Sequence, residues 1–293
     1  MYLMTCTRPD LAYPLSILAR YVAPGRHRNE HMGAAKRVLR YLCSTLGMGL
    51  VLGGQARVVL TGHADASWVD DLATQRSPQG YTSSLGSGSV SWRSTRSSFV
   101  LSSSCEAEIY AGAMAAQELR WLTYLLTDLG EAPRSPPVLY VDNKAMLALC
   151  QEHRLEHKTK HIALRYFLAR ELQQRGQLRL AYMATQANTA DIFTKALQPC
   201  DHQRFCTMLA CFAFLDRSCD LLVKQPPGSP PVFKARCVAR GYSQRDGVNF
   251  FQTFSPTPKM TTLRVLLHVV GQRIYELHFL ELLTTFLQGI LHE

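Results

Sequence analysis

The spacing of apolar residues changes along the chain and divides it into helical and strand-like stretches. Over residues 27–46, apolar side chains recur every three or four positions, which predicts an amphipathic helix. A Pro-Gly pair at 24–25 precedes this stretch and Gly47 follows it, as expected at helix ends. The apolar positions are Met32, Ala35, Leu39 and Leu42, and Lys36, Arg37 and Arg40 project elsewhere.

Short apolar runs bounded by turn residues follow, and they predict an antiparallel ribbon. Strands are expected at 58–65, 80–82, 90–92 and 99–101, with glycines at 86 and 88 in one turn. A long helix is then predicted over 104–129, because helical spacing returns and Gly130 and Pro133 end it.

The next part of the chain alternates between strand and helix patterns. We expect a strand at 138–142, helices at 144–151 and 161–174, a strand at 178–182 and a last helix from Asn188. This order of elements predicts an α/β fold with a mixed sheet. A Pro-Pro-Gly-Ser-Pro-Pro stretch at 226–231 is typical of a linker, and the residues beyond it are too few for a large core.

Composition narrows the class of protein. The chain has 293 residues, of which 47% are hydrophobic, and this argues against wholesale disorder. No apolar run reaches the roughly 18 residues of a membrane-spanning helix, so no membrane partner is expected. The start of the chain lacks the pattern of a secretory signal, and the nine cysteines are irregularly spaced. Both features predict a reducing, intracellular location and leave cytoplasm and nucleus open.

The net charge of +10 is unevenly distributed, because residues 1–60 alone contribute +6. A basic surface predicts a polyanionic partner such as nucleic acid, although basic surfaces also aid solubility without any partner. Lys36, Arg37 and Arg40 on the predicted N-terminal helix are the expected contacts to that polyanion.

Three aspartates stand where elements of the predicted α/β layer begin or end. Asp65 ends the first strand, Asp142 ends the strand at 138–142, and Asp191 lies in the first turn of the last helix. Taken singly, each is explained as a turn or capping residue. Gathered in one place they would repel one another, and divalent cations with a preference for oxygen, such as Mg²⁺, would neutralise them. Two such ions roughly 4 Å apart can promote phosphodiester hydrolysis.

The long helix offers two glutamates, and spacing separates their roles. Glu106 follows Ser103 at the distance of a capping box, which predicts a structural role at the helix start. Glu108 instead falls on the apolar stripe that continues through Ala111 and Ala115. A buried carboxylate is costly unless it is paired or binds a metal, so Glu108 is the functional candidate.

Five sequence blocks occur with a characteristic order and spacing. They are Gly-His-Ala-Asp-Ala-Ser-Trp at 62–68, Leu-Ser-Ser-Ser-Cys-Glu-Ala-Glu at 101–108, Leu-Tyr-Val-Asp-Asn at 139–143, Lys-Thr-Lys-His-Ile at 158–162 and Ala-Asp-Ile-Phe-Thr-Lys-Ala-Leu at 190–197. Together they resemble the ribonuclease H domain of copia-type retrotransposon Pol polyproteins. The stretches at 7–12 and 34–42 resemble the segment that joins polymerase to ribonuclease H in the same family.

The resemblance implies a ribonuclease H-like mixed five-stranded sheet flanked by helices, and hydrolysis of RNA paired to DNA. It implies catalysis with two Mg²⁺ ions, with Mn²⁺ as the alternative, bound by the four carboxylates already selected. It also makes the 158–162 block a candidate contact for nucleic acid. The implied catalytic and metal residues are Asp65, Glu108, Asp142 and Asp191, and the further contact candidates are Lys158, Lys160 and His161.

Two departures from the family pattern bear on the site. Ser67 stands where the family often has a second acid, but Asp65 itself is retained. The loop at 183–187 lacks the histidine that cellular ribonucleases H often carry there. His161 could be offered as a substitute, but its place beside two lysines favours a structural or phosphate-contact role.

The C-terminal part resembles the opening of the copia-type reverse transcriptase, which precedes ribonuclease H in the family but follows it here. The matching stretches are 234–244, 253–256 and 285–289. The family's first metal-binding aspartate falls at Glu281, and a neighbouring lysine falls at Leu283, so no polymerase activity is expected. A complete reverse transcriptase supplied by another chain is the further partner that this implies.

The resemblance divides the chain into four parts. These are a helical connection segment at 1–55, a ribonuclease H-like domain at 56–200, a junction at 201–232 and a small, incomplete α+β reverse-transcriptase fragment at 233–293. A catalytically inactive nucleic-acid-binding remnant and a decayed product that does not fold as a unit stand as alternatives to an active nuclease.

The cysteines and the histidine near the junction admit two readings. Their spacing matches no established zinc finger, and aromatic residues among them favour packing instead. The residues in question are Cys200, His202, Cys206, Cys211 and Cys219, with Phe205, Leu209, Phe212 and Phe214 between them.

Overall fold

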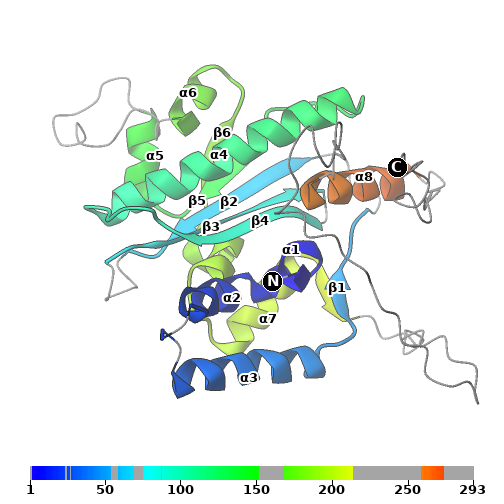
Figure 1. Cartoon of the computed structure of the whole chain (residues 1–293). Coiled ribbons are helices and arrows are strands. Elements are labelled where there is room, and N and C mark those ends of the chain that lie inside the picture. The colour runs from blue at the N-terminus through cyan, green and yellow to red at the C-terminus, as the bar shows by residue number, and fades with distance from the viewer. Residues whose placement is uncertain are drawn as a thin grey trace, which may run out of the picture.

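A mixed five-stranded sheet forms the centre of the molecule in the computed structural model of the chain (Figure 1). The structure describes residues 2–23, 25–26, 28–53, 59–68, 75–86, 88–151, 168–213 and 259–273. In the sheet the strands follow the order β4-β3-β2-β5-β6. They are β2 (Leu60–Ala66), β3 (Pro78–Leu85), β4 (Gly88–Arg96), β5 (Val138–Val141) and β6 (Arg179–Tyr182). This confirms the predicted α/β class with a mixed sheet flanked by helices.

The first three strands form an antiparallel ribbon, and the last two add parallel to it. Strand β2 lies between β3, with which it is antiparallel, and β5, with which it is parallel. The pairing of β3 with β4 starts where Pro78 faces Arg96. The predicted strand at 99–101 is wrong, because β4 ends at Arg96, opposite the first residue of β3, and the residues after it lead without strand pairing to α4.

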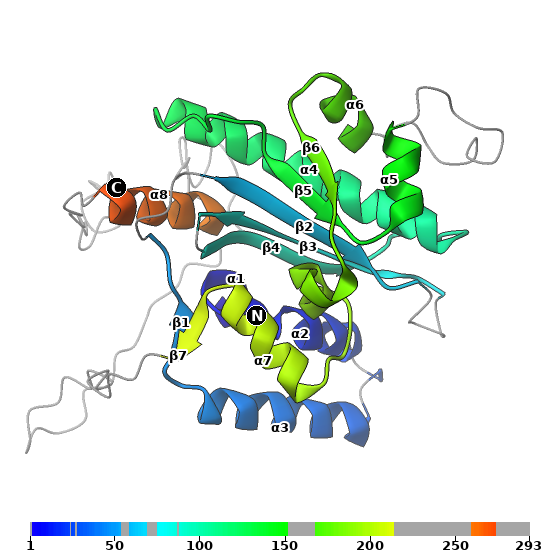
Figure 2. The same ribbon diagram turned by 180° about the vertical axis from the view of Figure 1, so that it is seen from behind.

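The long helix α4 (Ser104–Asp128) covers one face of the sheet, with α5 (Lys144–Gln151) and α6 (Leu168–Gln174) beside it (Figures 1 and 2). A glycine on β2 lets α4 approach closely, since a Cβ on Gly62 would lie 2.7 Å from Leu119 Cδ1. Helix α4 confirms the prediction for 104–129. The predicted helix at 161–174 is confirmed over its last part, and its start lies outside the described residues.

The N-terminal segment packs on the opposite face together with the residues after the sheet (Figures 1 and 2). Strand β1, which precedes the five-stranded sheet in the chain, pairs antiparallel with β7, which follows it. The elements on this side are α1 (Tyr2–Cys6), η1 (Pro9–Leu11), α2 (Ala12–Leu18), η2 (Ala19–Tyr21), α3 (Asn29–Ser44), β1 (Met48–Leu50), α7 (Pro199–Met208) and β7 (Cys211–Ala213).

Helix α3 confirms the predicted N-terminal helix but not the direction of its apolar side. Met32 and Leu39 are 56% and 60% exposed, and Lys36 and Arg40 are exposed as well. The side that faces inward is instead fixed by Tyr41, whose hydroxyl donates a hydrogen bond of 2.8 Å to Asp10 Oδ2. The buried polar partner therefore overrides the apolar spacing in setting the rotation of this helix.

Helix α8 (Met260–Arg273) is the described part of the predicted C-terminal fragment. Its residues Val265 and Val269 are buried in the main core, which consists mainly of residues of the sheet, of α4 and of the helices next to α4. Within the described ranges, no helix combines the length and the apolar character that a membrane span requires.

Candidate metal centre

Asp65 is the central residue of a cluster of carboxylates at the end of β2. Its side chain is buried and accepts hydrogen bonds from the Thr194 hydroxyl and from the Lys195 ammonium, the latter at 3.1 Å. A glycine on β3 makes room for the segment that brings these donors, because a Cβ on Gly80 would lie 2.5 Å from Phe193 Cβ.

Asp142 and Asp191 converge on Asp65 from two other elements. Asp142 follows directly after β5, which is parallel to β2, and its Oδ2 accepts a hydrogen bond of 2.8 Å from the Thr185 hydroxyl. Asp191 lies in η6 (Thr189–Phe193), a short 3₁₀-helix capped by the side chain of Asn188. One carboxylate oxygen from each of the three aspartates lies within 4.8 Å of the other two. Among the described residues, no other three potential metal ligands lie this close together.

The element that carries Asp191 differs from the prediction. In place of one helix from Asn188, the chain forms the five-residue η6 and then α7, which starts at Pro199. The side chain of Asn188 accepts a hydrogen bond from the Ala190 amide and donates another to Ala64 O at 3.0 Å. This second bond ties η6 to β2 and so keeps Asp191 beside Asp65.

Glu108 on α4 is buried and lies close enough to Asp65 and Asp142 to feel their charges, but it is not part of the group of three whose oxygens lie within 4.8 Å of one another. Burial raises the pKa of Glu108 well above its usual value, and the nearby charges of Asp65 and Asp142 raise it further. The backbone amide of Ala66 donates a hydrogen bond to its carboxyl group, whereas Oε2 has no hydrogen-bond partner among the described residues. A buried carboxyl oxygen without a hydrogen-bond partner is free to coordinate a cation.

Glu106 has the structural role predicted for it. Its carboxylate accepts hydrogen bonds from the amide and the hydroxyl of Ser102, both at 2.7 Å, and Ser103 caps the helix by accepting from the Glu106 amide at 3.1 Å. These bonds fix the start of α4 and thereby the position of Glu108, half a turn further along.

Sequence reasoning missed Lys195. Its ammonium lies 3.1 Å from Asp65 Oδ1 and 3.0 Å from Asp191 Oδ1. Burial alone would lower the pKa of Lys195, but the two carboxylates outweigh it and raise the pKa above its usual value. The spacing of Asp191 and Lys195 by four residues was the available signal, since such pairs meet on one side of a helical turn.

One ammonium does not neutralise this cluster. Burial and the charge of Asp65 still raise the pKa of Asp191 to about 7, even though Lys195 opposes the shift. Oxygen ligands of this kind suit hard divalent cations. The cluster of Asp65, Asp142 and Asp191 is therefore compatible with binding a divalent metal ion.

The predicted nucleic-acid contacts fall in two places. Lys36, Arg37 and Arg40 are exposed on α3, in the layer on the other side of the sheet from α4 (Figure 1). Lys158, Lys160 and His161 lie outside the described residues.

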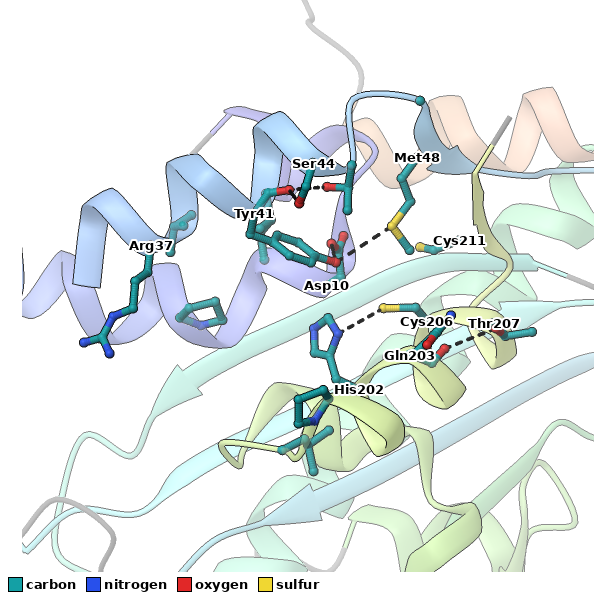
Figure 3. A pocket seen from close by; sticks show the side chains of 17 residues that line it. Asp10, Arg37, Tyr41, Ser44, Met48, His202, Gln203, Cys206, Thr207 and Cys211 are labelled. Carbon is teal, nitrogen blue, oxygen red and sulfur yellow. Dashed lines mark hydrogen bonds between the residues drawn. The ribbon is translucent and has the colours of Figure 1, made fainter. Parts of the chain in front are cut away.

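A cavity of about 900 Å³ lies between α3 and α7, and residues from both helices line it (Figure 3). The Sγ atom of Cys206 lies 3.7 Å from His202 Nδ1, but no third potential metal ligand among the described residues converges on this pair. Burial raises the pKa of the Cys206 thiol to about 12, which disfavours the thiolate that zinc requires. Phe205 and Leu209 are buried, so the packing reading is confirmed for them.

Comparison with known proteins gives two kinds of sequence match. Residues 224–293 match the family described as Reverse transcriptase (RNA-dependent DNA polymerase). Over 199 residues the chain is 38% identical to the Retrovirus-related Pol polyprotein from transposon RE2 of Arabidopsis thaliana, which covers 68% of the chain and 14% of that polyprotein. Over 203 residues it is 35% identical to the corresponding polyprotein from transposon RE1, covering 69% and 14%. The chain thus spans about one seventh of the length of these relatives.

Solved structures similar to the chain include the N-terminal ribonuclease H domain of a Mycobacterium tuberculosis protein. The similarity covers 51% of this chain and 97% of that one, at 13% identity and a TM-score of 0.33. The fold assignment rests on the order and direction of the strands rather than on this score.

Proposed function

Because the chain belongs to the family of copia-type retrotransposon Pol polyproteins, we propose that its α/β domain is a ribonuclease H that hydrolyses the RNA strand of RNA–DNA hybrids with two divalent metal ions. The observation that carries the proposal is the convergence of Asp65, Asp142 and Asp191 from three separate elements, with one oxygen of each within 4.8 Å of the others. Mg²⁺ is the proposed ion and Mn²⁺ the alternative, because both prefer carboxylate and water ligands.

The residues of the site have separate roles in this proposal. Asp65, Asp142 and Asp191 would hold the ions, and the unpaired Oε2 of Glu108 would complete the set of ligands from α4. Bound ions would activate a water molecule and stabilise the leaving oxygen of the phosphodiester. Lys195 fixes the orientation of Asp65 and Asp191 by hydrogen bonds to both.

The proposed substrate is a nucleic-acid duplex with an RNA strand. The basic N-terminal segment, with Lys36, Arg37 and Arg40, supplies positive charge for the phosphates, and the block at 158–162 is a second candidate contact. Discrimination of RNA from DNA would depend on the 2′-hydroxyl and on the A-like shape of the hybrid. A complete reverse transcriptase from another chain would supply such hybrids.

A nucleic-acid-binding remnant without activity is the second candidate. The observation in its favour is the position of the reverse-transcriptase match at 224–293, after the nuclease-like part of the chain. A remnant would bind hybrids with a strong dependence on salt, because phosphate contacts release counterions, but it would not cut them.

The deciding experiment compares cleavage of an end-labelled RNA–DNA hybrid in Mg²⁺ by the wild-type chain and by Asp65→Asn. We expect the variant to lose at least about a hundredfold in rate, as is typical when a group that stabilises transition-state charge is removed. Glu171→Gln is the matched control, because Glu171 on α6 pairs with Arg175, just after that helix, in an exposed ion pair. Equal cleavage by wild type and Asp65→Asn would reject the assignment of the site.

A further inference from the structure

Arg264 on α8 is a buried cation whose described hydrogen-bond acceptors are carbonyl and hydroxyl oxygens. Its Nε donates to Val90 O at 2.6 Å, and its Nη1 donates to Thr5 O at 2.7 Å and to Cys6 O at 3.2 Å. The guanidinium carbon also lies 4.0 Å from the centre of the Trp92 ring. A guanidinium is costly to bury without such partners, so this arrangement of carbonyls and ring is specific for it.

The strand that receives Arg264 is an edge of the sheet. Strand β4 lies at the end of the strand order and pairs only with β3, and the carbonyl of Val90, which a shift in the β3–β4 register leaves without a Cα partner, accepts the bond from Arg264. Nearby, the Trp92 indole donates a hydrogen bond of 2.9 Å to Met4 O on α1. Exposed edge strands invite pairing with other chains, and a covering helix is one of the usual protections. Helices α8 and α1 together provide that cover.

The remaining contacts hold α8 along its whole length. Near its start, the Lys259 ammonium lies 5.0 Å from the centre of the Trp121 ring on α4. In its middle, His268 is fully buried and its Nδ1 accepts a hydrogen bond of 3.1 Å from the Gly53 amide. At its end, the Arg273 Nε donates to Glu131 Oε1 at 2.8 Å. These three contacts reach α4, the segment before β2 and the segment after α4.

We propose that α8 is a permanent structural part of the nuclease-like domain, docked in cis, although it lies within the segment that matches the reverse-transcriptase family. The surface it fits is formed by the edge of β4, the carbonyls at the end of α1, the amide of Gly53 and the ring of Trp121. The reverse-transcriptase segment thus contributes an interface helix to this chain, whether or not the metal centre is active.

Hydrogen exchange of the full chain, followed by mass spectrometry, tests this interface. We expect amides of 259–273 and 88–92 to be protected to a similar degree, because a docked helix and the strand it covers open together. Rapid exchange of the helix with continued protection of the sheet would overturn the proposal, and this readout needs no variant. Dilution gives a second readout. If α8 docks within its own chain, its amides stay protected when the protein is diluted to a monomer. If α8 is supplied by a second copy, dilution removes the protection.

A matched pair of variants on the same helix sharpens the test. Arg264→Gln removes the charge that meets Val90, Thr5 and Cys6, and should raise exchange at least about tenfold over 6–8, 88–92 and 259–273 together. Arg273→Gln removes an ion pair in which the arginine is 55% exposed and should leave the exchange of 6–8 and 88–92 unchanged. Equal behaviour of the two variants over 88–92 would contradict the proposed role of Arg264.

Discussion

The ammonium of Lys195 lies 3.1 Å from Asp65 Oδ1, across a separation of 130 residues in the chain. The same nitrogen lies 3.0 Å from Asp191 Oδ1, so that one positive charge links the end of β2 to η6. Among the described residues, this ammonium is the cation that forms hydrogen bonds to both Asp65 and Asp191.

Lys195→Met should lower stability in the absence of divalent ions, because it leaves Asp65 and Asp191 without their shared counter-charge. We expect a loss of about 1–3 kcal/mol, less than for a fully buried pair, because the ammonium is one-third exposed. Thermal unfolding in EDTA and in Mg²⁺ measures this, and Mg²⁺ should restore most of the loss. Lys36→Met, at an exposed position on α3, is the control. An equal loss in both media would contradict the counter-ion role.

Glu108→Gln should stabilise the metal-free protein and weaken its response to metal. The substitution keeps the shape of the side chain but removes a buried acidic group whose pKa is raised by burial and by the charges of Asp65 and Asp142. We expect a gain of about 1 kcal/mol in EDTA and a smaller upward shift of Tm on adding Mn²⁺. Glu106→Gln provides the contrast, since it weakens the capping of α4 and should destabilise the protein in both media. A full Mn²⁺ response in Glu108→Gln would exclude Glu108 as a ligand.

Gly80→Ala should disturb the metal centre through η6. A Cβ at this position would lie 2.5 Å from Phe193 Cβ, so η6 must move and take Asp191 with it. Overpacking of this kind costs about 1–3 kcal/mol, and we expect weaker binding of Mn²⁺ in titration calorimetry as well. Gly33→Ala on α3 has open space around its Cβ and should be neutral or slightly stabilising. Unchanged Mn²⁺ affinity in Gly80→Ala would show that the position of η6 does not control the site.

His268 should make the docking of α8 sensitive to mild acid. Burial lowers the pKa of His268 to about 4, below its ordinary value near 6.5, so the folded state favours the neutral ring. The stabilisation is therefore complete above pH 6.5 and is lost as the pH falls toward 4. Between pH 7 and pH 5 the loss amounts to about 2 kcal/mol.

Urea unfolding of the wild type and of His268→Asn over this pH range isolates the contribution of His268. The asparagine can still accept a hydrogen bond from Gly53 but does not titrate, so the difference between the two curves should shrink as the pH falls. A difference that is constant from pH 7 to pH 5 would exclude protonation of His268 as the cause.

Local patterns predicted most of the elements and the approach of the three aspartates. Asp65 and Asp142 could be expected together because both stand at the ends of strands in one α/β layer, and Glu108 could be separated from Glu106 by its place on the apolar stripe. The rotation of α3 could not be predicted, because it depends on the hydrogen bond between Tyr41 and Asp10, which are 31 positions apart in the chain.

Long-range partners account for what the sequence did not reveal. Lys195 carries no sign in the sequence that its charge is shared with Asp65, and the spacing to Asp191 is common on solvated helices. The docking of α8 depends on carbonyl oxygens of α1 and β4, which any sequence provides. Only the tertiary arrangement makes these oxygens into a binding surface.

The antiparallel pairing of β1 with β7 places Gly49 opposite Phe212. A strand that precedes the nuclease-like sheet in the chain therefore pairs with a strand that follows it. A shortened protein starting at residue 56 would lack β1 and leave one side of β7 without its hydrogen bonds. Expression boundaries drawn from the sequence blocks alone would separate β1 from β7. The smallest piece suited to biochemical work therefore has to begin upstream of β1 and extend past β7.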